Sequence, residues 1–360
     1  MRRGLVWGGV VAIGVAALGA AALFLPGVQD RLVGLAIDRM IAFQSEAVFE
    51  DDALRVAFCG TASPLPHPTR AHTCVAVFAG GRFLVVDVGP GSWNQFALWR
   101  VDAARIDAVF LTHFHSDHIG DLGEWNLQTW VAGRSGPLPV LGPPGVERVV
   151  AGFEEAYALD TAYRIAHHGA EFLRPEAGRM QARVVAPPAD GAGPSIAWEK
   201  DGLRVTAFAV DHSPVRPAYG YRFDYRGRSV VVSGDTVKSP ALIEAARGAD
   251  VLVHEALAKH LVSRMREGAE KAGRSRVAKI LGDIPSYHTS PVEAAEAANE
   301  AGVRLLVLTH LAPPPPNAFA LRVFTRGVAD VRSGAWIVAD DGLLVELPLG
   351  SSAVRTVRID

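Results

Sequence analysis

Residues 112–118 read Thr-His-Phe-His-Ser-Asp-His and directly follow the apolar run at residues 108–111. That run is short, apolar and partly β-branched, which predicts a buried strand. In open α/β sheets, the polar residues that follow a strand at its C-terminal end form the site of chemistry. The stretch therefore predicts an α/β fold with a functional site at the end of this strand.

The residue types in this stretch suit a metal ion. His113 and His115 are two positions apart, so both imidazoles can face one point, and Asp117 and His118 follow where the chain turns into a helix. Imidazole nitrogens and carboxylate oxygens are ligands for zinc, iron or manganese. The alternative is a histidine-rich surface turn.

Similar polar positions follow other predicted strands. They are His212 after strand 203–210, Asp235 after 229–232, His254 and Glu255 after 251–253, and His310 after 305–308. A carboxylate such as Asp235 can bridge two cations, because each of its oxygens can face a different metal. The pattern predicts one site assembled from several strand ends.

The order of these motifs resembles the ribonuclease Z and arylsulfatase-like branch of the metallo-β-lactamase superfamily, over roughly residues 54–312. The resemblance implies an αββα sandwich, which we place at residues 52–350. It also implies two zinc ions, with Mn²⁺ or Fe²⁺ as alternatives. The ligands that it implies are His113, His115 and His212 for one ion, Asp117, His118 and His310 for the other, and Asp235 as a bridge. Asp87 would orient a metal-bound imidazole, or would only stabilise the turn in which it lies.

The catalytic residues expected from the resemblance are Asp235, His288 and Glu255. A hydroxide bridging the metals would attack the substrate, and His288, held by Glu255, would protonate the leaving group. Alternatively, His288 is a surface residue ahead of the helix that begins at 291. For His254 we expect a structural role.

The activity expected is hydrolysis of a phosphodiester or a sulfate ester, with a small-molecule ester as substrate. Alternatives for the same site are a lactone, a carboxylic ester or a thioester. A transfer-RNA 3′ endonuclease is disfavoured, because the segment between His212 and Asp235 is too short for the arm with which ribonuclease Z grips its substrate. A metal-binding scaffold without turnover is the remaining alternative. The protein partner expected, if there is one, is a second copy of the chain in a homodimer.

The N-terminus predicts export. Arg2 and Arg3 precede residues 5–25, which carry no charge and are long enough to span a bilayer. We expect a signal anchor or signal peptide in residues 1–27, an amphipathic helix or linker in 28–51, and a catalytic domain on the periplasmic side. A buried helix is the alternative, and no nucleic-acid partner is expected.

Charge and cysteine content give weaker constraints. The chain has 36 Lys and Arg residues and 38 Asp and Glu residues, so it has no overall electrostatic field that attracts polyanions. Basic residues are nonetheless in excess between His254 and His288, which suits either a lid over an anionic substrate or a solvated helix face. Cys59 and Cys74 either form a disulfide or remain buried thiols.

Overall fold

The computed structural model describes residues 22–42, 45–186 and 193–359. The chain divides into two units, Met1–Ser45 and Glu46–Asp360. In the first unit, helix α2 (Pro26–Ala42) carries exposed apolar side chains such as Leu35 and Ile41. Most of the expected membrane span lies outside the described residues. Among those that are described, no helix combines the length and the apolar character needed to cross a membrane.

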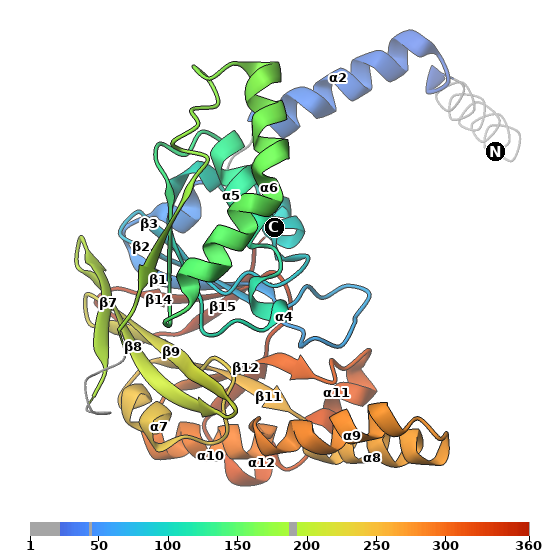
Figure 1. The fold of residues 1–360 in the computed structure, drawn as a ribbon, viewed down its shortest axis with the longest axis vertical. Helices are drawn as coiled ribbons and strands as arrows, with labels where there is room; N and C mark the ends of the chain where they lie inside the picture. Colours follow the sequence, from blue (N-terminus) through green and yellow to red (C-terminus); the bar gives the residue numbers. More distant parts are fainter. Residues whose placement is uncertain (1–21, 43–44, 187–192, 360) are drawn as a thin grey trace, which may run out of the picture. The chain divides into compact units, whose positions relative to one another are not determined.

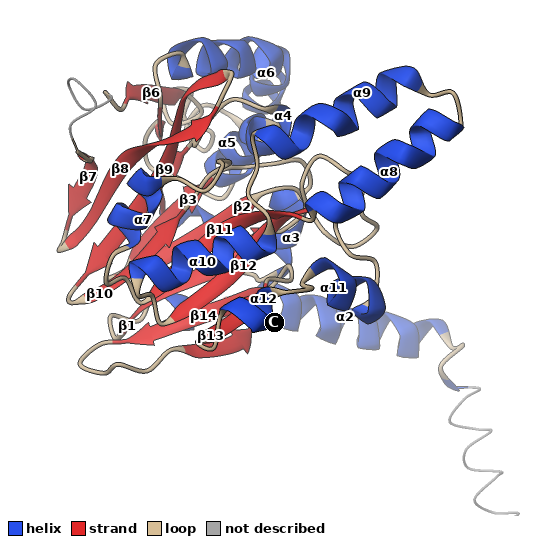
Figure 2. Cartoon of the chain, turned by 90° about the horizontal axis from the view of Figure 1, so that it is seen from below, coloured by secondary structure: helices blue, strands red, loops and turns tan. Residues whose placement is uncertain are grey.

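Two mixed sheets form the centre of the second unit, as Figures 1 and 2 show. The first sheet has the order β15-β14-β1-β2-β3-β4-β5-β6, and the second has the order β13-β12-β11-β10-β9-β8-β7. Strands β3 to β6 run parallel to one another, as do β10 to β13, while the other neighbours are antiparallel. The parallel strands bring several strand ends to one edge.

The strands have the following bounds. Those of the first sheet are β1 (Ala53–Gly60), β2 (Cys74–Ala79), β3 (Arg82–Val86), β4 (Ile106–Phe110), β5 (Leu138–Gly142), β6 (Met180–Val184), β14 (Leu343–Pro348) and β15 (Arg355–Arg358). Those of the second are β7 (Ser195–Lys200), β8 (Leu203–His212), β9 (Val215–Tyr225), β10 (Arg228–Val232), β11 (Val251–Leu257), β12 (Leu305–Ala312) and β13 (Ala335–Val338).

Helices cover the outer faces of both sheets. On the side of the first sheet lie α3 (Ser92–Leu98), α5 (Leu122–Val131) and α6 (Val146–His168), with the short α4 (Ser116–Ile119) at the site. On the side of the second lie α7 (Pro240–Ala246), α10 (Pro291–Ala301) and α12 (Val328–Val331). The remaining helices are α8 (Lys259–Lys271), α9 (Ser275–Asp283) and α11 (Ala318–Phe324).

The core has three layers, as an αββα sandwich requires. Side chains from both sheets, including Phe110 and Tyr221, fill the space between them. A second layer packs the first sheet against its helices around Trp125, and a third packs the alanine face of α10 on the second sheet. Burial on both faces explains why β1, β2 and β12 are apolar almost throughout. The predicted fold class is confirmed.

Local signals in the sequence locate several elements closely. Gly80 and Gly81, both at positive φ, form the turn of the hairpin between β2 and β3. Helix α6 continues to His168 and ends at Gly169, which has a φ of 85°. His167 and His168 are exposed on its last turn, so they lie apart from the site.

Of the two alternatives for the cysteines, the structure has the disulfide. Cys59 in β1 and Cys74 in β2 are bonded across an antiparallel strand pair, and both are fully buried. The pairing follows from a strand register that places Gly60 opposite Cys74.

We expect the double substitution Cys59→Ala/Cys74→Ala to lower the free energy of unfolding. The bond joins residues 15 apart, and closing a loop of this length contributes roughly 3 kcal/mol. Urea unfolding of the variant and of the oxidised wild-type protein measures the difference. Equal midpoints and slopes for the two proteins would contradict the prediction.

Candidate metal centre

Seven side chains converge at the edge where strands of both sheets end. His113 and His115 follow β4, and Asp117 and His118 lie on α4 immediately after them. From the second sheet come His212 at the end of β8, Asp235 just after β10 and His310 in β12. Their ligand atoms form two groups that could hold metal ions, His113, His115, His212 and Asp235 in one, and Asp117, His118 and His310 in the other.

One oxygen of Asp235 lies at the centre of both groups. Its Oδ2 is 3.8 Å from Nε2 of His113 and of His212. The same atom is 3.3 Å from Nε2 of His118 and 3.5 Å from Nε2 of His310. A single carboxylate therefore faces histidines of both groups, as a bridging ligand must.

The three histidines of the first group have lowered pKa values. Burial lowers the pKa of His113 well below 6.5, and it also lowers the pKa of His115 and His212. These imidazoles are accordingly neutral at pH 7, with lone pairs available. Neutral imidazole is the form that binds a metal ion.

The second group is surrounded by carboxylates, those of Asp117, Asp235 and Asp87. Burial opposes charge on His118, yet Asp235, Asp117 and Asp87 raise its pKa well above 6.5. Burial likewise opposes ionisation of Asp235, but His310 and His118 hold its pKa well below the usual value. The acidic side chains thus stay ionised in a buried place, and their field favours any cation there.

The donor set fits metal ions. His118 Nε2 and Asp235 Oδ1 are buried and have no hydrogen-bond partner among the described residues. Buried polar atoms normally have partners, so such orphans point to a missing ligand. Nitrogen and oxygen donors in this number suit zinc.

Neighbouring groups orient two of the imidazoles. Asp87 Oδ2 lies 2.8 Å from Nδ1 of His118, and the hydroxyl of Thr112 donates to the same oxygen at 2.8 Å. The backbone N–H of Thr112 donates to the other Asp87 oxygen. At His212, Nδ1 donates to the carbonyl of Tyr287 at 2.9 Å. Partners of this kind fix the ring so that Nε2 points into the site.

Thr112 and Tyr287 are contributions that the sequence analysis missed. Each is adjacent in sequence to a predicted site residue, His113 or His288, and adjacency was the only signal available. The backbone also adapts locally, since Asp87 and His310 are non-glycine residues at positive φ. Such conformations carry strain and concentrate at functional sites.

His288 and Glu255 form a pair beside the ligands. Nδ1 of His288 lies 2.9 Å from Oε1 of Glu255, which also accepts from the N–H groups of Thr236 and Thr289. Burial lowers the pKa of His288, but Glu255 and Asp235 raise it to about 9. His288 also forms a third possible metal group with Asp235 and His310. His254 is buried behind the site and bonds the carbonyl of Glu255, apart from all three groups.

The site opens toward solvent at His115, the exposed member of the two ligand groups. On the inner side, a cavity of about 10 Å³ lined by Asp87, His118 and Asp235 is too small for a substrate. Substrate must therefore approach from the side of His115.

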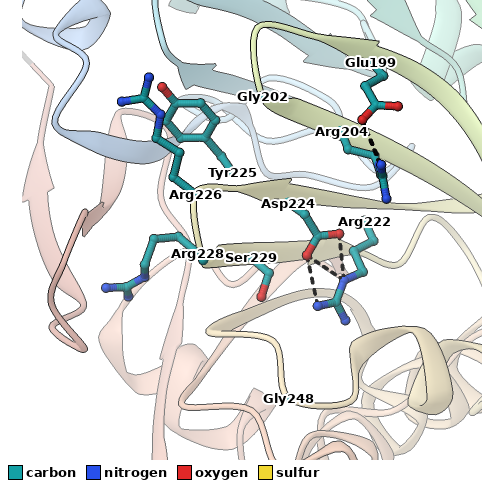
Figure 3. A pocket seen from close by; sticks show the side chains of 11 residues that line it. Glu199, Gly202, Arg204, Arg222, Asp224, Tyr225, Arg226, Arg228, Ser229 and Gly248 are labelled. Atoms are coloured by element: carbon teal, nitrogen blue, oxygen red, sulfur yellow. Dashed lines mark hydrogen bonds and ion pairs between the residues drawn. The ribbon is translucent and has the colours of Figure 1, made fainter.

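A separate surface hollow of about 430 Å³ contains none of these residues (Figure 3). Within it, Arg222 pairs with Asp224 and Arg204 with Glu199. Its other two arginines pair with residues outside it, Arg226 with Asp51 and Arg228 with Asp250. We assign it no function, because its charges are already partnered.

Comparison with known proteins agrees with this geometry. Residues 82–311 match the family described as the beta-lactamase superfamily domain. Ribonuclease Z of Mycobacterium bovis is 40% identical over 263 residues, which cover 72% of this chain and 86% of that protein. Ribonuclease Z of Mycobacterium marinum is 38% identical over 270 residues, covering 72% and 87%.

Solved structures share the fold. Human tRNase Z, short form, has a TM-score of 0.58 at 20% identity and covers 82% of this chain and 100% of its own. The metallo-beta-lactamase fold protein YhfI of Bacillus subtilis has a TM-score of 0.57 at 21% identity, with the same coverage.

These relatives correct two expectations. The exclusion of a nucleic-acid partner is wrong, because the relatives are ribonucleases by name. The net charge of −2 describes the whole chain and does not preclude a local basic surface. The expected membrane attachment and periplasmic location, which supported that exclusion, are contradicted by the same relatives.

The resemblance read from the motifs is confirmed by both the family match and the identity to the curated relatives. The matched segment contains the strands that carry the candidate site. Six of the seven candidate ligands lie after or within β4, β8 and β10, and Glu255 lies in β11. The segment also extends into β12, which contains His310. The chain therefore belongs to the ribonuclease Z family of the beta-lactamase superfamily, and it is a metal-dependent hydrolase of ester bonds.

Proposed function

We propose that this protein is a zinc-dependent endonuclease that cleaves a phosphodiester bond of precursor transfer RNA. The observation that carries the proposal is the identity of 40% to a ribonuclease Z across 86% of that relative's length. The ligand geometry supports it, because Asp235 faces histidines of both groups.

The two groups divide the ligands between two zinc ions. His113, His115 and His212 would hold one, Asp117, His118 and His310 the other, with Asp235 between them. When bound, the ions would supply an activated water and neutralise charge that develops on the phosphate. Asp87 would hold the ring of His118 in place through its hydrogen bond.

His288 is our candidate for the general acid. Its Nδ1 is engaged by Glu255, which leaves Nε2 to carry the transferable proton. A pKa of about 9 keeps the ring protonated at neutral pH, so the proton is available to the departing ribose oxygen. Glu255 acts as a positioning residue, because it contacts His288 and two backbone N–H groups.

We expect the full-length protein to cleave a transfer-RNA transcript that carries a 3′ extension, and to lose this activity in EDTA and regain it with zinc. Denaturing gels and end mapping of the products measure the cleavage. A parallel panel consists of a bis-aryl phosphodiester, an aryl sulfate, an aryl ester and a lactone. Turnover of the sulfate or the lactone with no cleavage of the transcript would contradict the proposal.

A further inference from the structure

Helices α8 and α9 form a hairpin that extends beyond the two sheets (Figures 1 and 2). We call residues 259–283 the basic arm. The two helices pack through Val262, Ala269, Ala278 and Leu281, which are buried together. Gly273, at positive φ, makes the turn between them. The apolar face of each helix is therefore used inside the hairpin, and the charged faces point outward.

The basic arm has an excess of positive charge. It contains seven basic and three acidic side chains, a net charge of +4 with histidine neutral, within a chain whose net charge is −2. Four of the basic residues are in ion pairs, namely Lys259, Arg264, Arg266 and Lys279. The other three, Lys271, Arg274 and Arg276, are exposed and have no ion-pair partner among the described residues.

These three residues cluster at the far end of the basic arm. Lys271 ends α8, Arg274 precedes α9 and Arg276 lies in its first turn. A helix of 13 residues is about 20 Å long, so the cluster stands roughly that far from the base of α8. On a solvated helix face, basic residues usually form ion pairs with acidic neighbours, as they do in the rest of the basic arm. The three basic residues at the tip form no such pairs among the described residues.

The base of the basic arm adjoins the candidate active site. Helix α9 leads through the 3-10 helix η4 (Ile284–Ser286) into Tyr287, whose carbonyl orients His212, and then into His288. At its other end, α8 follows β11, which carries Glu255. A polyanion bound at the tip would thus contact a helical hairpin that continues directly into the residues of the candidate active site.

We propose that the tip of the basic arm binds the phosphate backbone of the RNA substrate at a distance from the scissile bond. The proposal rests on the proposed function, and charge complementarity selects the partner. The segment between His212 and Asp235 consists of the strands β9 and β10 and their connections, so it provides no arm of its own. Lys271, Arg274 and Arg276, whose charges are not paired within the described ranges, instead face successive phosphates.

The test compares two triple variants of the full chain. Lys271→Ala/Arg274→Ala/Arg276→Ala removes the tip charges. The control Arg183→Ala/Arg355→Ala/Arg358→Ala removes three exposed arginines on β6 and β15, none of which has an ion pair within the described ranges. Both variants lose the same charge, so a general electrostatic effect is equal in the two. The probes are the extended transfer-RNA transcript and a bis-aryl phosphodiester.

We expect the tip variant to bind the transcript at least ten-fold more weakly than the control at physiological salt. Each lost phosphate contact should reduce the slope of log Kd against log salt concentration by about one, so three should reduce it by roughly 2 to 3. Turnover of the small diester should not change, because it does not reach the tip.

Each outcome decides between the two proposals. If wild-type protein cleaves the transcript and both triple variants bind it alike, the arm proposal is overturned and the proposed function stands. If wild-type protein binds the transcript but does not cleave it, and the tip variant alone binds weakly, the proposed function is overturned and the arm proposal is supported. No binding by wild-type protein overturns both.

Discussion

His113→Ala is expected to lose metal and to reduce cleavage by at least about 1000-fold. His113 is fully buried, and its Nε2 lies 2.9 Å from Nδ1 of His115 and 3.8 Å from Asp235. Removing it would leave the first ion with two imidazoles and a shared carboxylate. Loss of metal assistance corresponds to several kcal/mol of transition-state stabilisation, and each 1.36 kcal/mol is a factor of ten in rate.

Metal content per chain, measured by mass spectrometry after gel filtration, tests this prediction alongside activity. His168→Ala is the matched control, because that histidine is exposed at the end of α6. Far-UV circular dichroism establishes that both variants are folded. Full occupancy of two metals in a folded His113→Ala protein would refute the ligand assignment.

His288→Ala is expected to retain both metals and to cleave RNA about 100- to 10,000-fold more slowly, the usual contribution of a general acid. The departing ribose oxygen is a poor leaving group and requires a proton, whereas an activated aryl oxygen does not. Hydrolysis of the bis-aryl phosphodiester should therefore fall much less. Equal losses on both substrates would count against proton donation, and loss of metal would identify His288 as a ligand in the third group.

Glu255→Gln is expected to shift the pH dependence of cleavage to lower pH. The carboxylate of Glu255 raises the pKa of His288 to about 9, against the effect of burial. In the wild-type protein the acid is present below that pH, and single-turnover cleavage should decline above it. Without the carboxylate the pKa of His288 is lower, so the decline should begin at lower pH in the variant. An unchanged upper limb would exclude His288 as the titrating acid.

Much of the candidate site could be predicted from sequence because its candidate ligands follow short apolar strands. A buried strand is recognisable from a few residues, and the polar positions after 108–111 and 229–232 stand out against that background. The Gly80-Gly81 hairpin is likewise a local property, since only glycine adopts two successive positive φ angles easily. The turn and the ligand motifs are therefore encoded by neighbours in sequence.

The partner could not be predicted in this way. Net charge is a sum over all residues, whereas RNA would meet only one surface. Residues 259–283 contain basic and acidic residues in mixed order. Folding into α8 and α9 pairs some of them, whereas Lys271, Arg274 and Arg276 at the tip have no ion-pair partner in the described part of the chain. Ion pairing within a hairpin depends on helix ends, which sequence patterns locate poorly.

By itself the sequence determined the α/β class, the residue types of the candidate metal ligands and the positions of the strands that carry them. Only the tertiary structure decided which groups meet. Asp87 reaches His118 across 31 residues, Cys59 bonds Cys74 through the register of β1 and β2, and Glu255 gathers His288 and two backbone donors. These contacts join residues distant in sequence, and they form because sheet pairing fixes strand ends in space.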